Sequence, residues 1–151
     1  MEARTQMSIA ALEAGMAINN ASVTIVHGMS RPIGALFHVP HGLSNAMLLE
    51  KCMSFAADGA YGKFAELGRA IGAADSAMSD RSAAKAFVSA LGEMCSICEV
   101  PTLLEYGIDK SEFMAAAGKM AADAVASGSP SNTIKEISKE NVLEIYASLW
   151  N

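Results

Sequence analysis

The chain has 151 residues, which is enough for one domain with a substantial core and too few for two domains of ordinary size. Apolar residues make up 52% of the sequence and charged residues 18%, a balance that excludes a disordered protein. The net charge of −5 argues against a nucleic-acid partner. No apolar run approaches the roughly 18 residues that a membrane span needs. Since three cysteines cannot all pair within one chain, we expect a soluble, cytoplasmic protein.

The apolar spacing predicts a series of helices separated by short connections. In the first segment, Ile9, Leu12 and Met16 recur at helical spacing among small residues, which predicts a thin helix. A thin helix permits close packing against a neighbour. Pro32 is expected to disturb or end the second helix. The expected helices cover residues 4–20, 22–31, 41–57, 61–71, 81–98, 109–126 and 139–150.

Capping residues mark several of these helix starts. Asp80 is a good N-cap for the helix that follows it, and Asp109 with Glu112 resembles a capping box. Ser138 can cap the last helix. With six to eight helices and no extended alternating pattern, the sequence predicts an all-α bundle or orthogonal multi-helix array.

The beginning of the chain limits which nucleotide sites are possible. The first helix starts almost at Met1, so no strand, glycine-rich turn or βαβ unit precedes it, and the chain has no P-loop pattern. If the function involves a nucleotide, we expect most of its pocket to lie elsewhere.

All three histidines of the chain, His27, His38 and His41, fall within fifteen positions. They are either ordinary structural side chains or ligands. His41 at a helix start and His27 on the preceding helix can face one crevice, and imidazole is a common ligand of zinc and ferrous iron. Two histidines do not complete such a site, because zinc takes three or four protein ligands and ferrous iron usually adds a carboxylate.

The histidine region resembles a known family. The runs GMAINNASVTIVHGMSRPIG at 15–34 and VPHGLSNA at 39–46 are similar to the helical C-terminal domain of the iron-containing (group III) alcohol dehydrogenases, and the likeness extends over about residues 7–149. It implies a dehydroquinate synthase-like all-α fold. It also implies that His27 and His41, fourteen positions apart as in the family, are ligands of a divalent metal, Fe²⁺ or Zn²⁺.

The resemblance further implies a function for the complete enzyme, the NAD(P)-dependent oxidation of alcohols or reduction of aldehydes. In the family, the remaining ligands and the glycine-rich cofactor segment belong to an N-terminal α/β nucleotide-binding domain. That domain is absent from residues 1–151, which we therefore expect to form a single helical, metal-ligand-bearing domain. We expect the isolated chain to bind metal weakly and to be inactive.

Two positions near the ligands need separate interpretation. The family often has a histidine four residues after the first ligand, where this chain has Arg31. Arginine keeps its proton, so Arg31 cannot be a general base, but it can orient an anionic substrate or a cofactor phosphate, or face solvent. His38 is either a connector residue or a substitute in proton transfer.

The remaining patterns have simpler interpretations. Cys95 and Cys98 form a CxxC pattern that lacks a second zinc-binding pair and a redox-type βαβ setting, so we expect buried thiols. The scattered methionines are expected to fill the core. Two alternatives stay open: a truncated or split-enzyme module that acts through a partner chain or self-association, and an unrelated helical metal-binding protein.

Overall fold

The computed structural model describes residues 1–150, which form seven α-helices and two short 3₁₀ helices with no strand among them. The all-α fold class predicted from the sequence is confirmed. The α-helices are α1 (Glu2–Ala21), α2 (Ile25–Phe37), α3 (His41–Ala56), α4 (Tyr61–Ala70), α5 (Asp80–Ile97), α6 (Lys110–Ala126) and α7 (Lys139–Ser148). The 3₁₀ helices are η1 (Ala57–Gly59) and η2 (Ser129–Asn132).

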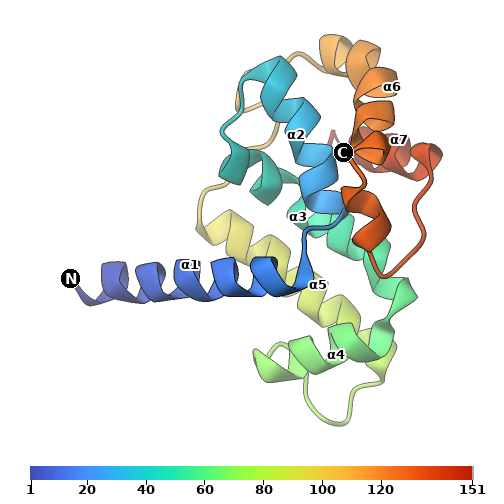
Figure 1. The fold of residues 1–151 in the computed structure, drawn as a ribbon. Coiled ribbons are helices and arrows are strands. Elements are labelled where there is room, and N and C mark those ends of the chain that lie inside the picture. Colours follow the sequence, from blue (N-terminus) through green and yellow to red (C-terminus); the bar gives the residue numbers. More distant parts are fainter. Residues whose placement is uncertain (151) are drawn as a thin grey trace.

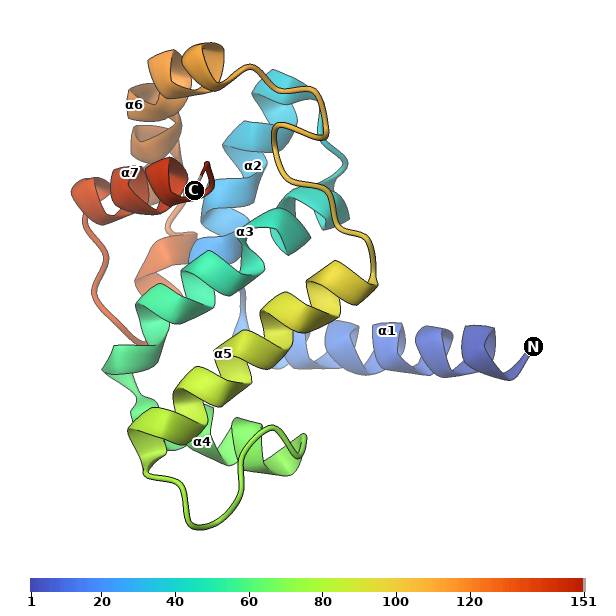
Figure 2. The ribbon, with the colours of Figure 1, turned by 180° about the vertical axis from the view of Figure 1, so that it is seen from behind.

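The helices form two packed groups joined by α3. At one end α2 packs against α3 and α6, and α6 packs against α7; at the other end α4 and α5 form a hairpin that contacts α3 through α5 (Figure 1). Seen from behind, α3 runs from the α2–α7 group to the α4–α5 hairpin (Figure 2). Because α3 contacts both groups, the position of its first residue is fixed relative to α2.

The main core lies between α2, α3, α6 and α7. Tyr146 of α7 is fully buried, and its hydroxyl donates a hydrogen bond of 2.8 Å to the Met29 carbonyl of α2. Phe113 of α6 is also fully buried and contacts the rings of Phe37, Tyr146 and Trp150, each with a centroid distance of 5.4 Å. These contacts hold α2, whose first turn carries His27, against the C-terminal helices.

Helix α1 lies outside this packed body. None of its residues is buried, and both views show it extending away from the other helices (Figures 1 and 2). Its apolar side chains face solvent, with Met7 70%, Leu12 61% and Met16 58% exposed. The close packing that a thin helix permits does not occur among the described residues. The helical spacing of its apolar residues predicts an apolar helix, but it does not identify the surface that the helix contacts.

Residues 1–150 contain no single helix with the length and apolar character needed to cross a membrane; α1 and α2 pass that test only as a pair, bent by 109° at their junction.

Pro32 does not end α2, contrary to the sequence prediction. The helix continues through it to Phe37 and ends where His38 adopts a left-handed conformation with φ of 54°. A proline inside a helix costs about 3 kcal/mol. Met29 and Ile33 on the same helix are both fully buried, and burying such a side chain contributes about 1.5–3 kcal/mol, so their packing offsets the cost.

From α3 onward the α-helix starts agree with the predictions to within a residue, whereas α1 begins at Glu2 rather than at residue 4 and α2 at Ile25 rather than at residue 22. Two cap predictions also need correction. Ser79 rather than Asp80 is the N-cap of α5, because its hydroxyl accepts the Ser82 N–H at 3.3 Å. Asp109 caps α6 by accepting the Glu112 N–H at 2.9 Å, but only this half of the predicted capping box is present. Ser138 caps α7 as predicted, and Asn141 completes a reciprocal box with it.

The interpretation of the sulfur-containing residues needs correction. Cys52 is buried, but Cys95 is half-buried and Cys98 is exposed, so the CxxC pair is not a pair of buried thiols. Of the methionines, Met29 and Met120 are fully buried, whereas six have about two fifths or more of their surface exposed: Met1, Met7, Met16, Met78, Met94 and Met114. Methionine content therefore does not identify the core here, because two of the exposed ones belong to α1.

Candidate metal centre

The structure brings His27 and His41 together. Their ring centroids are 5.3 Å apart and the rings are tilted by 56°. His27 lies in the first turn of α2 and His41 is the first residue of α3, and these two helices pack against each other. The fourteen-residue separation thus spans the length of α2 and the short connection that returns the chain to the start of α3. Both imidazoles face the same region of the molecule.

A largely apolar hollow lies beside the pair. It has a volume of about 410 Å³ and His27 is part of its wall. The other residues that line it come from the end of α1, from the start of α2 and from α3: Ile18, Ser22, Val23, Thr24, Val26, Asn45, Ala46, Leu49 and Met53. A small organic molecule of few polar groups fits a hollow of this size and character.

The surroundings of His27 favour its neutral form. Burial lowers the pKa of His27 below its usual value, and the positive charges of protonated His41 and of Arg31 lower it further. A histidine must lose its proton to offer a ring nitrogen to a metal. The same environment therefore keeps His27 available as a ligand at pH values where an ordinary histidine is partly protonated.

Asn45 is a residue of this site that the sequence analysis did not single out. Its amide group lies 3.1 Å from Nε2 of His41, one helical turn earlier on α3, and this contact holds the ring in place. The Asn45 Oδ1 atom is buried and has no hydrogen-bond partner among the described residues. The sequence signal for this contact was the four-residue spacing of His41 and Asn45, since residues i and i+4 of a helix lie on one face.

Arg31 lies one turn after His27 on α2. Its side chain is exposed, and its Nη1 donates a hydrogen bond of 3.0 Å to the Ser129 hydroxyl of η2. No carboxylate of residues 1–150 forms a salt bridge with it. A positive charge without an acidic partner thus stands beside the histidine pair.

His38 lies at the other end of α2 from His27. Eleven positions at 1.5 Å each separate the two residues by about 16 Å along the helix axis. The His38 side chain is exposed, and its backbone carbonyl accepts a hydrogen bond of 3.3 Å from the Tyr106 hydroxyl. The structure does not bring the His38 ring into the His27–His41 pair.

The glycine after His27 serves helix packing. A Cβ at Gly28 would lie 2.8 Å from Cδ and Cγ of Pro130, so η2 packs directly on α2 at this point. The space that glycine leaves beside the histidine is therefore filled by protein. At Gly42, beside His41, the space is open, with nothing within 4 Å of the position a Cβ would take.

The donor set suits part of a metal site. Two imidazoles facing each other at this distance match the ligand preference of zinc and ferrous iron, and the buried, unpartnered oxygen of Asn45 shows that the polar groups here are not all satisfied by protein. Residues 1–150 contain no group of three or more His, Cys, Asp or Glu side chains placed to hold a metal. The pair fits a divalent metal as two of its ligands, and a metal held there would need its other ligands from outside these residues.

Comparisons with known proteins identify the family of this chain. Residues 1–150 match the model of the Fe-containing alcohol dehydrogenase family, C-terminal. The chain is 31% identical over 150 residues to lactaldehyde reductase of Escherichia coli, a match that covers 99% of this chain and 38% of the relative. It is 28% identical over the same length to the NADPH-dependent butanol dehydrogenase of Clostridium saccharobutylicum, again covering 38% of that protein.

A solved structure of 1,3-propanediol oxidoreductase superposes with a TM-score of 0.90 at 27% identity, covering 98% of this chain and 38% of that one. The chain belongs to the Fe-containing alcohol dehydrogenase family, of which it forms the helical C-terminal portion. The resemblance seen in the histidine region is thereby confirmed. The chain spans about two fifths of the length of the relatives it matches.

Proposed function

We propose that these residues are the metal-carrying helical part of an NAD(P)-dependent alcohol dehydrogenase that interconverts alcohols and aldehydes. The observation that carries the proposal is the approach of the His27 and His41 rings to 5.3 Å beside an apolar hollow. Family membership supports it, since the relatives include an NADPH-dependent butanol dehydrogenase. Their names also include reduction of an aldehyde.

His27 and His41 would hold a divalent iron or zinc ion through neutral imidazole nitrogens. When bound, such an ion supplies Lewis acidity toward an alcohol or aldehyde oxygen, and the nicotinamide accepts or donates hydride. Asn45 orients the His41 ring through its contact with Nε2. The apolar residues of the adjacent hollow exclude water from the reacting carbon.

Two further residues have proposed roles. Arg31, a permanent cation beside the pair without an acidic partner among the described residues, would orient an anionic group of the substrate or a cofactor phosphate. His38 would handle protons only if another part of the enzyme brings the reacting atoms toward the end of α2. The position of Arg31, one helical turn from His27, supports its proposed role, whereas His38 has no such position near the histidine pair.

A polypeptide of these 151 residues alone should not oxidise alcohols, because the described residues supply two metal ligands and no strand-based nucleotide site. The assay mixes the purified chain with Fe²⁺ or Zn²⁺, NAD or NADP and a primary alcohol, and follows formation of the reduced nicotinamide. A chimera in which residues 1–150 replace the matching part of lactaldehyde reductase should turn over, and its His27→Ala variant should not. A folded chimera whose turnover survives His27→Ala contradicts the proposal, as does clear turnover by the chain alone.

The alternative of an assembly module is favoured by one observation, the exposed apolar helix α1. We propose that α1 promotes association of two copies of the 151-residue chain in solution. The cytoplasm remains the compartment we propose for the protein, because a reducing environment suits its three free thiols.

A further inference from the structure

The CxxC pair lies at the C-terminal end of α5, where the backbone is held in one conformation. The Val100 N–H donates to the Cys95 carbonyl and the Glu99 N–H to the Ser96 carbonyl, both at 3.0 Å. Glu99 adopts a left-handed conformation with φ of 54°. These three features define a Schellman motif, in which Cys95 occupies the third position from the end and Cys98 is the cap.

This motif places the two cysteines at a separation that a disulfide accepts. Residues three apart in an α-helix have Cα atoms about 5 Å apart, because the rise is 1.5 Å per residue and the two positions are about 60° apart around the helix axis. Disulfides join Cα atoms at roughly 4.4–6.8 Å. The Cα separation of Cys95 and Cys98 is therefore within the range that a disulfide joins, and a small adjustment of the last helical turn brings their Cβ atoms, about 5–6 Å apart at this spacing, into bonding range.

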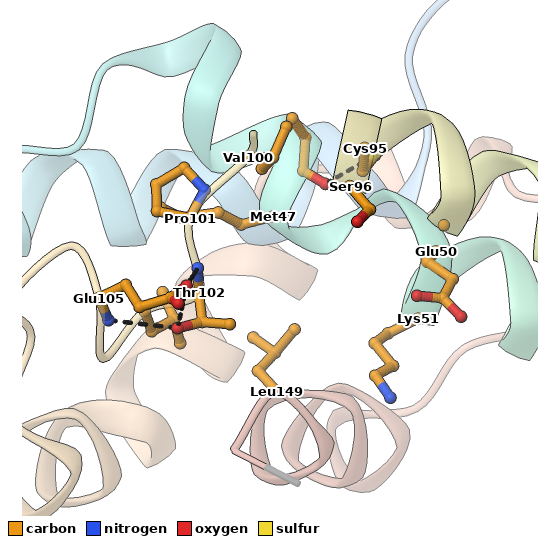
Figure 3. A pocket seen from close by; sticks show the side chains of 13 residues that line it. Met47, Glu50, Lys51, Cys95, Ser96, Val100, Pro101, Thr102, Glu105 and Leu149 are labelled. Atoms are coloured by element: carbon orange, nitrogen blue, oxygen red, sulfur yellow. Dashed lines mark hydrogen bonds between the residues drawn. The ribbon is translucent and has the colours of Figure 1, made fainter. Parts of the chain in front are cut away.

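The two thiols differ in their surroundings. Cys98 is exposed, whereas Cys95 is half-buried, lines a hollow of about 460 Å³ between α3 and α5, and donates a weak hydrogen bond of 3.8 Å to the Ala46 carbonyl (Figure 3). Burial, the neighbouring Cys98 and Glu50 across the hollow raise the pKa of the Cys95 thiol. Cys98 is thus the thiol that an external reagent meets first, and Cys95 is the thiol held beside it.

We propose that Cys95 and Cys98 form a redox-sensitive dithiol that a low-molecular-weight disulfide of the glutathione type oxidises to an internal disulfide. The Cys98 thiolate attacks one sulfur of the small disulfide, forming a mixed disulfide and releasing one small thiol. The Cys95 thiolate then attacks the Cys98 sulfur, closing the Cys95–Cys98 bond and releasing the second small thiol. Two cysteine thiols lose two electrons and two protons, and the small disulfide gains them.

Closing this bond has a local consequence. The Cys95 sulfur gives up its hydrogen bond to the Ala46 carbonyl of α3, on the wall of the hollow. The raised pKa of Cys95, caused first by its burial, means that this thiol is not stabilised as a thiolate. A dithiol whose reduced form is not stabilised as a thiolate is a weak oxidant, so the disulfide persists once it has formed.

Cys52 provides an internal control. It is fully buried in α3 and burial raises its pKa to about 12, so it should not react while the protein is folded. The three thiols are therefore expected to behave in three different ways: Cys98 reacts first, Cys95 resolves the mixed disulfide, and Cys52 stays reduced.

The test treats the reduced chain with glutathione disulfide, alkylates the free thiols after denaturation, and measures the mass of the intact protein. The wild-type chain should lose two hydrogen atoms, carry no glutathione and take up one alkyl group. Cys95→Ser should keep one glutathione on Cys98, Cys98→Ser should stay largely unmodified, and Cys52→Ala should form the disulfide but take up no alkyl group.

Circular dichroism checks that each variant is folded, and peptide mapping of the oxidised wild-type chain identifies the joined cysteines even if a variant does not fold. Three results for the wild-type chain would overturn the proposal. The chain could retain glutathione as Cys95→Ser does, it could form disulfide-linked dimers, or it could join Cys52 to another cysteine. None of these outcomes depends on metal binding or dehydrogenase activity.

Discussion

At the scale of single residues, the ionisation of His27 connects the environment of the site to its chemistry. Burial, His41 and Arg31 all lower the pKa of His27. We predict that NMR titration of the imidazole finds His27 titrating below pH 6.5, and that Arg31→Met raises its pKa because one positive neighbour is removed. Arg4→Met, on the solvent-exposed helix α1, is the matched control and should leave the titration unchanged. A His27 that titrates at or above its usual value would contradict this.

The same shift predicts how stability depends on pH. In the window between the lowered pKa and 6.5, the unfolded chain binds a proton at position 27 that the folded chain does not. The free energy of unfolding should therefore rise with pH through this window and level off above it. Urea unfolding at a series of pH values measures the slope, and His27→Gln should reduce it. An unchanged slope in that variant would show that other groups dominate.

A second residue-level prediction concerns Tyr146. Its hydroxyl donates a 2.8 Å hydrogen bond to the Met29 carbonyl in the main core. Tyr146→Phe removes this bond without changing the packing of the ring, so the free energy of unfolding should fall by about 1 kcal/mol. Denaturant unfolding tests it, and a loss near zero would mean that the bond adds nothing to the contact between α7 and α2.

At this scale the sequence identified the histidine pair but not its surroundings. The spacing of His27 and His41 and their resemblance to a family pointed to one site, and the rings do lie together. The contact between Arg31 and Ser129 joins residues 98 positions apart, and no local pattern predicts it. The exposure of Cys98 was missed because helical spacing gives two cysteines a common face without saying whether another helix covers that face.

At the scale of elements, the packing of η2 on α2 fixes the start of α2. A Cβ at Gly28 would clash with Pro130 at 2.8 Å, so Gly28→Ala should lower the free energy of unfolding by about 1–3 kcal/mol. Gly118 in α6 is the matched control, because nothing lies within 4 Å of the position of its Cβ. Gly118→Ala should raise stability by up to about 1 kcal/mol, since alanine favours helix. If Gly28→Ala and Gly118→Ala change the free energy of unfolding by the same amount, the clash with Pro130 is ruled out.

Most helices could be predicted, because caps and apolar spacing are local signals. Ser138 and Asp109 cap the helices they were expected to cap. Pro32 shows the limit of local reasoning, since the buried contacts of Met29 and Ile33 that keep α2 continuous come from distant parts of the chain.

At the scale of the whole molecule, the exposed helix α1 should drive self-association of the 151-residue chain. Its apolar side chains, led by Met7 and Leu12, have no packing partner among the described residues. Sedimentation velocity should show a concentration-dependent shift toward a dimer. Leu12→Lys should weaken the association, whereas Glu13→Gln on the same helix should leave it unchanged. A monomer at all concentrations would show that α1 does not bind a second copy.

The all-α architecture followed from the sequence, but the isolation of α1 did not. An apolar helix in a sequence is ordinarily expected to be buried, and only the arrangement of the other helices shows that none of them covers it (Figures 1 and 2). The two histidine rings likewise come together only because the connection after α2 places the start of α3 beside the first turn of α2.

Zinc titration of the chain, followed by the imidazole resonances of its three histidines, tests the shared metal site most directly. We expect His27 and His41 to shift together as Zn²⁺ is added, with weak affinity, while His38 at the far end of α2 serves as the internal reference and does not follow them. His27→Ala or His41→Ala should weaken Zn²⁺ binding by about tenfold or more. Removing a residue that only supports a metal ligand already lowers metal affinity by about tenfold, and removing the ligand itself should lower it at least as much. If the two rings respond at different Zn²⁺ concentrations, or not at all, they do not bind one ion.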